Sequence, residues 1–170
     1  MKLWRAPSRC VSAVESKAVQ LVGLLKEKKC TITTAESLTG GRIAGEITAV
    51  PGSSAVFPGG VVSYCDRIKH QLLGVPQDLL DEYGAVSEPV AKAMARGAAD
   101  LMGTGLALSA TGLAGPDGDG SGNPVGTVYL GLYAQGTVRC EKHVFSGDRE
   151  DIRRQSVERA IEIALEYLEQ

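Results

Sequence analysis

The chain has 170 residues, of which 44% are hydrophobic and only 5% aromatic, a composition suited to one compact domain with a sizeable core. Its 18 basic and 20 acidic residues give a net charge of −2 and are scattered without blocks, so no basic face is expected for nucleic acid or an anionic membrane. The sequence has no run of about 18 apolar residues, so no transmembrane helix is expected. We expect a cytoplasmic protein that binds neither nucleic acid nor membrane.

The cysteines also point to a reducing compartment. They stand at positions 10, 30, 65 and 140, without a C-x-x-C pair or a nearby histidine that would suggest zinc. Asp117 and Asp119 have a calcium-like spacing, but the rest of that loop motif is missing. We therefore expect no metal and no cofactor. Residues 1–12 are basic and lack the apolar core of a signal peptide, so we expect a flexible extension followed by one domain over residues 13–170.

The first part of the chain alternates helix and strand. Apolar residues recur at helical spacing over 14–28, which predicts an amphipathic helix. Residues 30–35 are short and β-branched, which predicts a strand, and residues 42–49 again predict a helix. Ser37 is therefore expected at a strand-to-helix turn.

The middle of the chain continues this alternation. Residues 59–65 predict a second strand, and Asp66 is well placed to cap the helix after it. Ser87 is expected to cap a longer helix that ends at Gly103. The almost wholly apolar run 106–110 predicts a strand buried on both faces.

The last third predicts a different local arrangement. A glycine-rich loop over 111–126 leads into two strands, 127–133 and 138–145, which read as a hairpin, and residues 149–169 predict a final helix. Early alternation followed by a late hairpin predicts an α/β fold, a three-layer α/β/α sandwich on a mostly parallel, mixed sheet of about five strands.

Ser37 has two interpretations. Ligands of open α/β sheets bind beyond the carboxyl ends of the strands, which favours Ser37 as a nucleophile. A serine hydroxyl needs a base and donors for the developing oxyanion to act in that way. Alternatively, Ser37 caps the helix that begins near Gly40. Local sequence leaves both interpretations open.

The candidate base is a lysine. His70 and His143 are expected to be plain surface residues, whereas Lys69, if partly desolvated in a cleft, would lose its proton more easily. The alternative for Lys69 is a solvated helix lysine. Tyr64 is either a core aromatic or a phenol that relays a proton, and Glu36 is expected to be a partly exposed turn carboxylate rather than a partner of Lys69.

Two loops contain residues suited to binding substrate. Thr39, Gly40 and Gly41 follow the serine, and successive glycines can leave amides free for an oxyanion or a phosphate. In the second loop the glycines either only permit tight turns or form part of a substrate-binding loop. Its candidate residues are Thr111, Gly112 and Gly115.

Seven segments, in order along the chain, carry a resemblance to a known family. They are residues 34–41, 50–57, Lys69 with 72–76, 84–87, 111–116, 124–126 and 147–149. Together they span roughly residues 30–165 and resemble the C-terminal domain of the competence/damage-inducible protein CinA. Stand-alone members of that family include nicotinamide-mononucleotide deamidases.

The resemblance implies a hydrolase that acts on a linear amide. Its substrate would be nicotinamide mononucleotide, converted without a metal to nicotinic acid mononucleotide and ammonia in pyridine nucleotide salvage. The residues that match Ser37 and Lys69 act as nucleophile and base in the family, and the match to Tyr64 assists. The resemblance also implies a homo-oligomer. Arg149, with the two glycine loops, is a candidate to bind the nucleotide phosphate.

Two departures from the family pattern bear on this prediction. Leu38 stands where many relatives carry cysteine, and Cys65-Asp66 follows Tyr64 where serine-asparagine is common. An alternative function is therefore a catalytically inactive nucleotide-binding or regulatory module, related to competence or the DNA-damage response.

Overall fold

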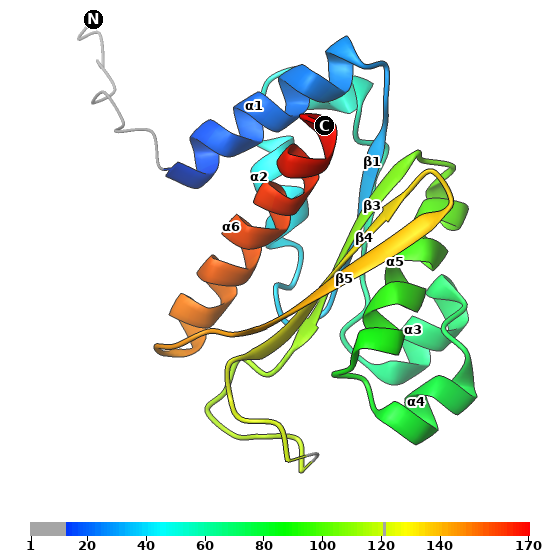
Figure 1. Cartoon of the computed structure of the whole chain (residues 1–170), viewed down its shortest axis with the longest axis vertical. Helices are drawn as coiled ribbons and strands as arrows, with labels where there is room; N and C mark the ends of the chain where they lie inside the picture. Colours follow the sequence, from blue (N-terminus) through cyan, green and yellow to red (C-terminus); the bar gives the residue numbers. More distant parts are fainter. Residues whose placement is uncertain (1–12, 121) are drawn as a thin grey trace, which may run out of the picture.

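The computed structural model describes residues 13–120 and 122–170. It has an α/β fold in which helices cover both faces of a five-stranded mixed sheet, as the sequence predicted (Figure 1). The elements are α1 (Ala13–Glu27), β1 (Ile32–Glu36), α2 (Arg42–Thr48), the short 3-10 helix η1 (Ser53–Ala55), β2 (Gly60–Val62), α3 (Asp66–Leu73), α4 (Gln77–Tyr83), α5 (Glu88–Met102), β3 (Leu106–Gly112), β4 (Thr127–Ala134), β5 (Thr137–Val144) and α6 (Arg149–Leu168).

The sheet brings three carboxyl-terminal strand ends to one edge. Its order is β2-β1-β3-β4-β5, with β1 parallel to both β2 and β3, and β4 antiparallel to β3 and β5. Glu36, the last residue of β1, is in register with Val62 of β2 and Ala110 of β3. The chain segments that follow β1 and β2 therefore leave the sheet side by side.

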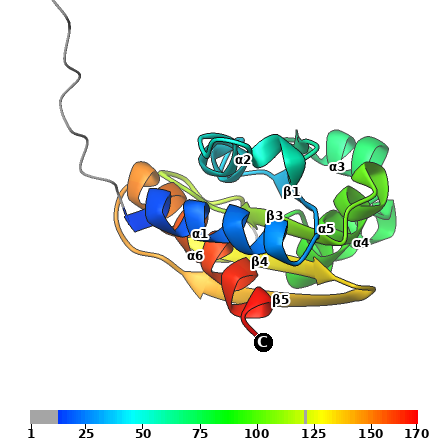
Figure 2. The ribbon, with the colours of Figure 1, turned by 90° about the horizontal axis from the view of Figure 1, so that it is seen from above.

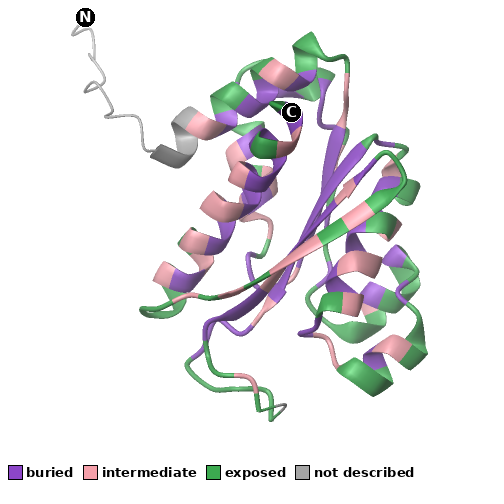
Figure 3. Cartoon of the chain, viewed as in Figure 1, coloured by how far each residue is buried: buried purple, intermediate pink, exposed green. Residues whose placement is uncertain are grey.

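Helices form a layer on each side of the sheet (Figures 1 and 2). On one face α1, α2 and α6 pack against alternate strand residues such as Ile32, Leu108 and Leu130, all of them buried. On the other face α5 covers the intervening residues Ala35 and Ala107, and α3 and α4 pack on α5. Burial on both faces explains why β1 and β3 lack the alternation of polar and apolar residues (Figure 3).

The hairpin prediction is confirmed, and its outer strand is the more exposed one. β4 and β5 are antiparallel and are joined through Gln135 and Gly136, both of which have positive φ. β5 alternates exposed and partly buried residues, as expected of an edge strand with one solvated face. The glycine-rich segment between β3 and β4 extends beyond the sheet (Figure 1).

The structure corrects the expected helix caps. Asp66 is the first residue of α3, and Cys65 occupies the N-cap position without a side-chain hydrogen bond. Ser87 is the N-cap residue of α5, but its hydroxyl donates to the Gly84 carbonyl, 2.8 Å away, and does not cap the helix. The seven-residue helix α4 was not predicted. It buries Leu80, but it is too short for a helical period to stand out.

The described residues contain no helix that is long and apolar enough to cross a membrane. Cys30, Cys65 and Cys140 are free thiols. Burial raises the pKa of the Cys140 thiol to about 12. That thiol is therefore protonated at neutral pH and is a poor nucleophile.

Candidate active site

Ser37 and Lys69 meet at the carboxyl edge of the sheet. Ser37 directly follows β1, and its N–H donates to the Ala110 carbonyl of β3 at 2.8 Å. Lys69 lies one turn into α3, and its Nζ is 3.4 Å from the Ser37 hydroxyl oxygen and 3.1 Å from the Ser63 carbonyl oxygen. The two side chains come from elements that parallel strand pairing places next to each other.

Lys69 is buried rather than solvated. Its side chain is only 2% exposed, so the surface-lysine interpretation is wrong. Burial lowers the pKa of the Lys69 amine, and the Asp66 carboxylate, 3.5 Å away and largely exposed, opposes that shift. A lowered pKa increases the fraction of neutral amine, which is the form that can remove a proton from a hydroxyl.

Glu36, not Ser37, caps α2. The Glu36 side chain is fully buried, and its carboxylate accepts hydrogen bonds from the N–H groups of Gly41, Ile43 and Ala44 at 2.8–3.0 Å. The expectation of a partly exposed turn carboxylate is therefore wrong. The residue at the N-cap position is Gly41, at φ 92°, which has no side chain that could accept these hydrogen bonds, so Glu36 accepts them instead. Glu36 leaves the Ser37 hydroxyl free to face Lys69.

Removing this carboxylate should destabilise the whole protein. Glu36→Ala would leave three N–H groups without their acceptor at the start of α2, two of them part-buried and that of Ile43 buried. We expect a loss of about 3 kcal/mol or more in the free energy of unfolding, since each orphaned donor costs about 1–3 kcal/mol. Urea denaturation measures this loss. Glu46→Ala, on the same helix, is the control and should change stability by less than about 0.5 kcal/mol.

The turn after Ser37 presents two free amides, but they are not the glycine amides. The Gly40 N–H donates to the Ser37 carbonyl at 3.0 Å, and the Gly41 N–H is taken by Glu36. Within the described residues, the N–H groups of Leu38 and Thr39 have no acceptor. The Thr39 side chain is fully buried, and its hydroxyl has no partner there either.

Tyr64 and Arg149 lie together at the rim of the site. Tyr64 is 60% exposed, so its interpretation as a core aromatic is wrong. The Arg149 guanidinium, at the start of α6, donates to the Tyr64 hydroxyl oxygen at 2.8 Å and to the Gly115 carbonyl at 2.6 Å. No hydrogen bond joins the phenol to Ser37 or Lys69 in the described part of the chain. Arg149 thus links the segment after β2 to the loop after β3.

Thr111 and Gly112 are the last two residues of β3, not the start of the loop as predicted, and they serve the fold. Thr111 is buried, and its hydroxyl donates to the Ala85 carbonyl at 2.7 Å. A Cβ on Gly112 would lie 2.6 Å from the Thr127 carbonyl oxygen, closer than van der Waals contact permits. The Thr111 hydroxyl is therefore engaged within the fold, and the space beside Gly112 is filled by β4. Gly115, in the loop after β3, is the residue that contacts another candidate, Arg149.

Arg153 is a part of the site that sequence reasoning missed. It lies on α6, one helical turn after Arg149, and its guanidinium donates to the carbonyls of Leu38 and Thr39. The contact joins residues more than 110 positions apart, and no local pattern in α6 distinguishes Arg153 from a surface arginine. The capping role of Glu36 was missed for a different reason. Its three hydrogen-bond donors are backbone N–H groups that come together only when α2 has formed.

Neither histidine belongs to the site. His70 is exposed and its Nδ1 lies 2.8 Å from the Val75 carbonyl oxygen, whereas His143 on β5 contacts Glu141. In residues 13–120 and 122–170, no three histidine, cysteine or acidic side chains are arranged to hold a metal ion.

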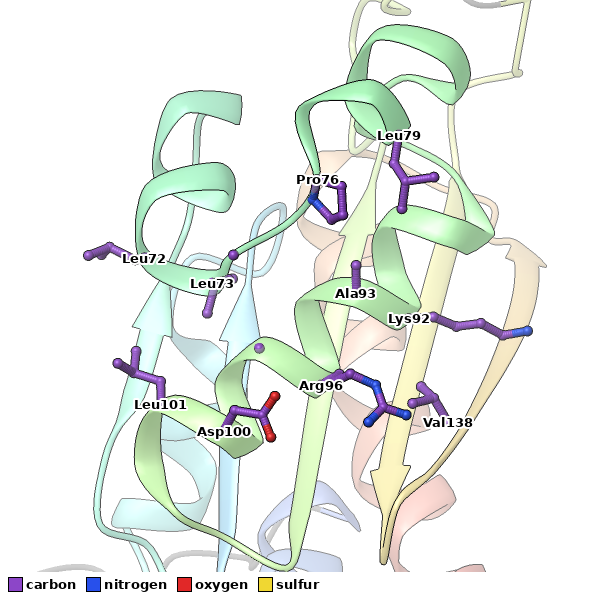
Figure 4. A pocket seen from close by; sticks show the side chains of 12 residues that line it. Leu72, Leu73, Pro76, Leu79, Lys92, Ala93, Arg96, Asp100, Leu101 and Val138 are labelled. Carbon is purple, nitrogen blue, oxygen red and sulfur yellow. The ribbon is translucent and has the colours of Figure 1, made fainter.

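A separate groove of about 760 Å³ lies along α5 (Figure 4). Leu72, Leu79 and Leu101 contribute to its apolar lining, with Arg96 and Asp100 among its ionisable residues. Arg96 is engaged elsewhere, since it donates to the Gly136 carbonyl and lies over the Tyr133 ring. Neither Ser37 nor Lys69 lines this groove, so it is distinct from the candidate active site.

The fold and the site define a mixed-sheet α/β protein with a serine and a buried lysine paired at the carboxyl edge of its sheet. Residues 14–168 match the model of the CinA C-terminal domain, and the chain belongs to that family. A CinA-like protein of Geotalea uraniireducens is 51% identical over 133 residues, which cover 78% of this chain and 32% of the relative. A putative competence-damage inducible protein of Clostridium beijerinckii is 49% identical over the same share of each chain.

Solved structures agree with this assignment. The competence/damage inducible protein CihA from Agrobacterium tumefaciens superposes with a TM-score of 0.89 at 35% identity and covers 100% of both chains. A CinA superfamily protein from Klebsiella pneumoniae gives a TM-score of 0.90 at 31% identity, covering 92% of this chain and 98% of that one. The chain spans about a third of the length of the curated relatives it matches.

Proposed function

We propose that the protein is a metal-independent amidohydrolase that uses Ser37 as nucleophile and Lys69 as general base. The observation that carries this proposal is the 3.4 Å approach of the Lys69 amine to the Ser37 hydroxyl, with the lysine 2% exposed. A buried amine with a lowered pKa supplies the base that a serine needs. The nearby Asp66 carboxylate and Ser63 carbonyl hold the amine in position.

The chemistry follows from this pair. The neutral Lys69 amine takes the hydroxyl proton as the Ser37 oxygen attacks the carboxamide carbon, which gives a tetrahedral oxyanion. Collapse of this intermediate breaks the carbon–nitrogen bond, and the Lys69 ammonium returns its proton to the leaving nitrogen, which departs as ammonia. Water then gives a proton to Lys69 as its oxygen attacks the acyl ester. The ester bond breaks, the acid leaves, and the Lys69 ammonium returns its proton to the Ser37 oxygen.

The turn after Ser37 supplies donors for the oxyanion. The N–H groups of Leu38 and Thr39 follow the nucleophile directly and have no acceptor within the described residues. Backbone N–H groups beside a nucleophile are common oxyanion donors, and removal of one such donor costs about 10²–10³-fold in rate. We assign this role to the Leu38 and Thr39 amides rather than to those of Gly40 and Gly41, which are already hydrogen bonded.

The proposed substrate is nicotinamide mononucleotide, from the family resemblance. The rim supports a phosphate contact, because the Arg149 guanidinium has five N–H donors and the structure assigns only two acceptors to it. The reaction is tested by measuring ammonia release from nicotinamide mononucleotide, nicotinamide riboside and nicotinamide by the purified protein. We expect the nucleotide to be the best substrate. Binding of the nucleotide without any product would instead support an inactive regulatory module.

The phosphate contact gives a separate prediction. Arg149→Gln should raise KM for the nucleotide by about 10-fold or more, because a charge-assisted hydrogen bond contributes about 1.5–3 kcal/mol. KM for the riboside, which lacks the phosphate, should change little. Arg154→Gln, an exposed position on the same helix, is the matched control. An equal loss on nucleotide and riboside would show that Arg149 does not bind the phosphate.

A further inference from the structure

Arg153 holds the turn that carries the nucleophile. Its Nε donates to the Leu38 carbonyl oxygen at 2.9 Å and its Nη2 to the Thr39 carbonyl oxygen at 3.1 Å. The side chain is 21% exposed, so these bonds are partly shielded from water. One planar guanidinium therefore holds the Leu38–Thr39 and Thr39–Gly40 peptide groups, which begin one residue after Ser37.

The geometry of a peptide group links these carbonyls to the free amides. In a trans peptide the C=O and the following N–H point in opposite directions. When Arg153 holds the Leu38 carbonyl, the Thr39 N–H of the same peptide must point away from α6. The Ser37 carbonyl is held in a similar way by the Gly40 N–H, at 3.0 Å, and this orients the Leu38 N–H.

The charge on Arg153 also strengthens the donor. A hydrogen bond to a carbonyl oxygen polarises the peptide, and hydrogen bonds in a chain reinforce one another. A cation at that oxygen has the larger effect, since charge-assisted hydrogen bonds are roughly twice as strong as neutral ones. Arg153 contacts two peptides, and the Thr39 N–H of the first has no acceptor in the described part of the chain, whereas the Gly40 N–H of the second donates to the Ser37 carbonyl.

One carboxylate lies near the guanidinium. Glu150 lies one turn earlier on α6, with its Oε2 3.9 Å from Arg153 Nη1, and it also pairs with Arg42 of α2. A Cβ added to Gly40 would approach Arg153 Nη2 at 3.1 Å, so the turn and the guanidinium are in close contact. The Glu36 carboxylate accepts hydrogen bonds from the N–H groups of Gly41 and Ile43, which follow this turn.

We propose that Arg153 is a positioning residue, which orients and polarises the Thr39 amide as an oxyanion donor without touching the substrate. This proposal rests on the proposed amidohydrolase function. It assigns to α6 a second role in the reaction, apart from the contact that Arg149 makes at the rim. Arg153→Lys keeps the charge but cannot reproduce the two-pronged contact, and Arg153→Met removes both while retaining the length of the side chain.

The kinetic test compares these variants with a control, Arg154→Met, in which the neighbouring exposed arginine is replaced. We expect Arg153→Met to lower kcat by about 10–100-fold and to leave KM within about twofold, since the donor acts mainly on the transition state. Arg153→Lys, which keeps the charge, should recover part of kcat. A kcat unchanged in Arg153→Met, or a change confined to KM, would overturn the proposal.

A second measurement is independent of turnover. The ¹⁵N chemical shift of a backbone amide responds to hydrogen bonding at the preceding carbonyl, so Arg153→Met should shift the Thr39 resonance, whereas Arg154→Met should not. If the wild-type protein releases no ammonia from any amide tested, the proposed function fails. The Thr39 chemical shift still tests whether Arg153 polarises the Thr39 amide. A Thr39 resonance at its wild-type position in Arg153→Met would show that Arg153 does not polarise this amide.

Discussion

Ser37→Ala is expected to lower the rate of ammonia release from nicotinamide mononucleotide by at least about 10³-fold, the scale of effect seen when a serine nucleophile is removed. The hydroxyl is the only group that the substitution deletes. The Ser37 N–H, which donates to Ala110, and its carbonyl, which accepts from Gly40, both remain. The fold should therefore persist, and circular dichroism with a thermal melt would verify it.

The control for this substitution is another serine. Ser54 lies in η1, is exposed and takes no part in the proposed chemistry, so Ser54→Ala should keep full activity. If Ser37→Ala also turned over at the wild-type rate, the assignment of the nucleophile would be wrong, whatever the substrate proved to be.

Lys69→Met is expected to abolish turnover to a similar degree without a loss of stability. Methionine has nearly the length of lysine and is apolar, so it suits a side-chain position that is 2% exposed. Burial lowers the pKa of Lys69, which means that the folded state disfavours the charged form. Removing a group that is costly to bury should leave the melting temperature unchanged or raise it, as is common at active sites. A melt and an ammonia assay on the same sample measure both effects.

The lowered pKa of Lys69 predicts how both stability and turnover change with pH. The pKa of Lys69 is lower in the folded than in the unfolded chain, so wild-type stability should rise as pH increases between those two values. The stability gain of Lys69→Met should accordingly be full at pH values below the folded-state pKa of Lys69 and should shrink as pH rises from there toward the unfolded-state pKa. Turnover needs the neutral amine, so kcat should rise with pH through the pKa of Lys69, below the ordinary lysine value of about 10.4.

Asp66→Asn tests the electrostatic part of this account. The Asp66 carboxylate raises the pKa of Lys69, so its neutral replacement should lower that pKa further. The rising limb of the pH–kcat profile should then move to lower pH. A limb that stays in place in Asp66→Asn, or one that moves to higher pH, would mean that Lys69 is not the group that titrates.

The sequence predicted the frame of the site better than its internal contacts. The apolar run ending at Ala110 and the β-branched run before Ser37 predict two buried strands, and parallel pairing then brings Ser37 to the same edge as the segment that precedes Lys69. The strand ends were less accurate, since β2 spans only Gly60–Val62 and β1 continues to Glu36.

The parts that the sequence did not predict depend on contacts between distant segments. Glu36 looks like a turn carboxylate until the backbone folds three N–H groups around it. Tyr64 looks as much like a core aromatic as a site residue until Arg149 of α6 meets its hydroxyl. Gly40 and Gly41 suggested free amides, but hydrogen bonds within the turn occupy both, since Gly40 donates to the Ser37 carbonyl and Gly41 to Glu36.

Several expectations stay predictions. The flexible N-terminal extension, residues 1–12, lies outside the described residues, and the single domain over 13–170 and the homo-oligomer are not tested by the fold. The roles of the candidate site residues stay predictions as well. What the structure adds is their arrangement, with Lys69 beside Ser37 and Arg149 between Tyr64 and Gly115.

The central claim is that Ser37 forms an ester with the acyl group of the substrate. Intact-mass spectrometry of protein quenched in acid during turnover of nicotinamide mononucleotide tests it most directly, with peptide mapping to locate the adduct and Lys69→Met mixed with substrate as a comparison. We predict a mass increase equal to the nucleotide less ammonia, located on Ser37 and absent from Ser37→Ala. An adduct on a different residue, or the same adduct in Ser37→Ala, would contradict the account.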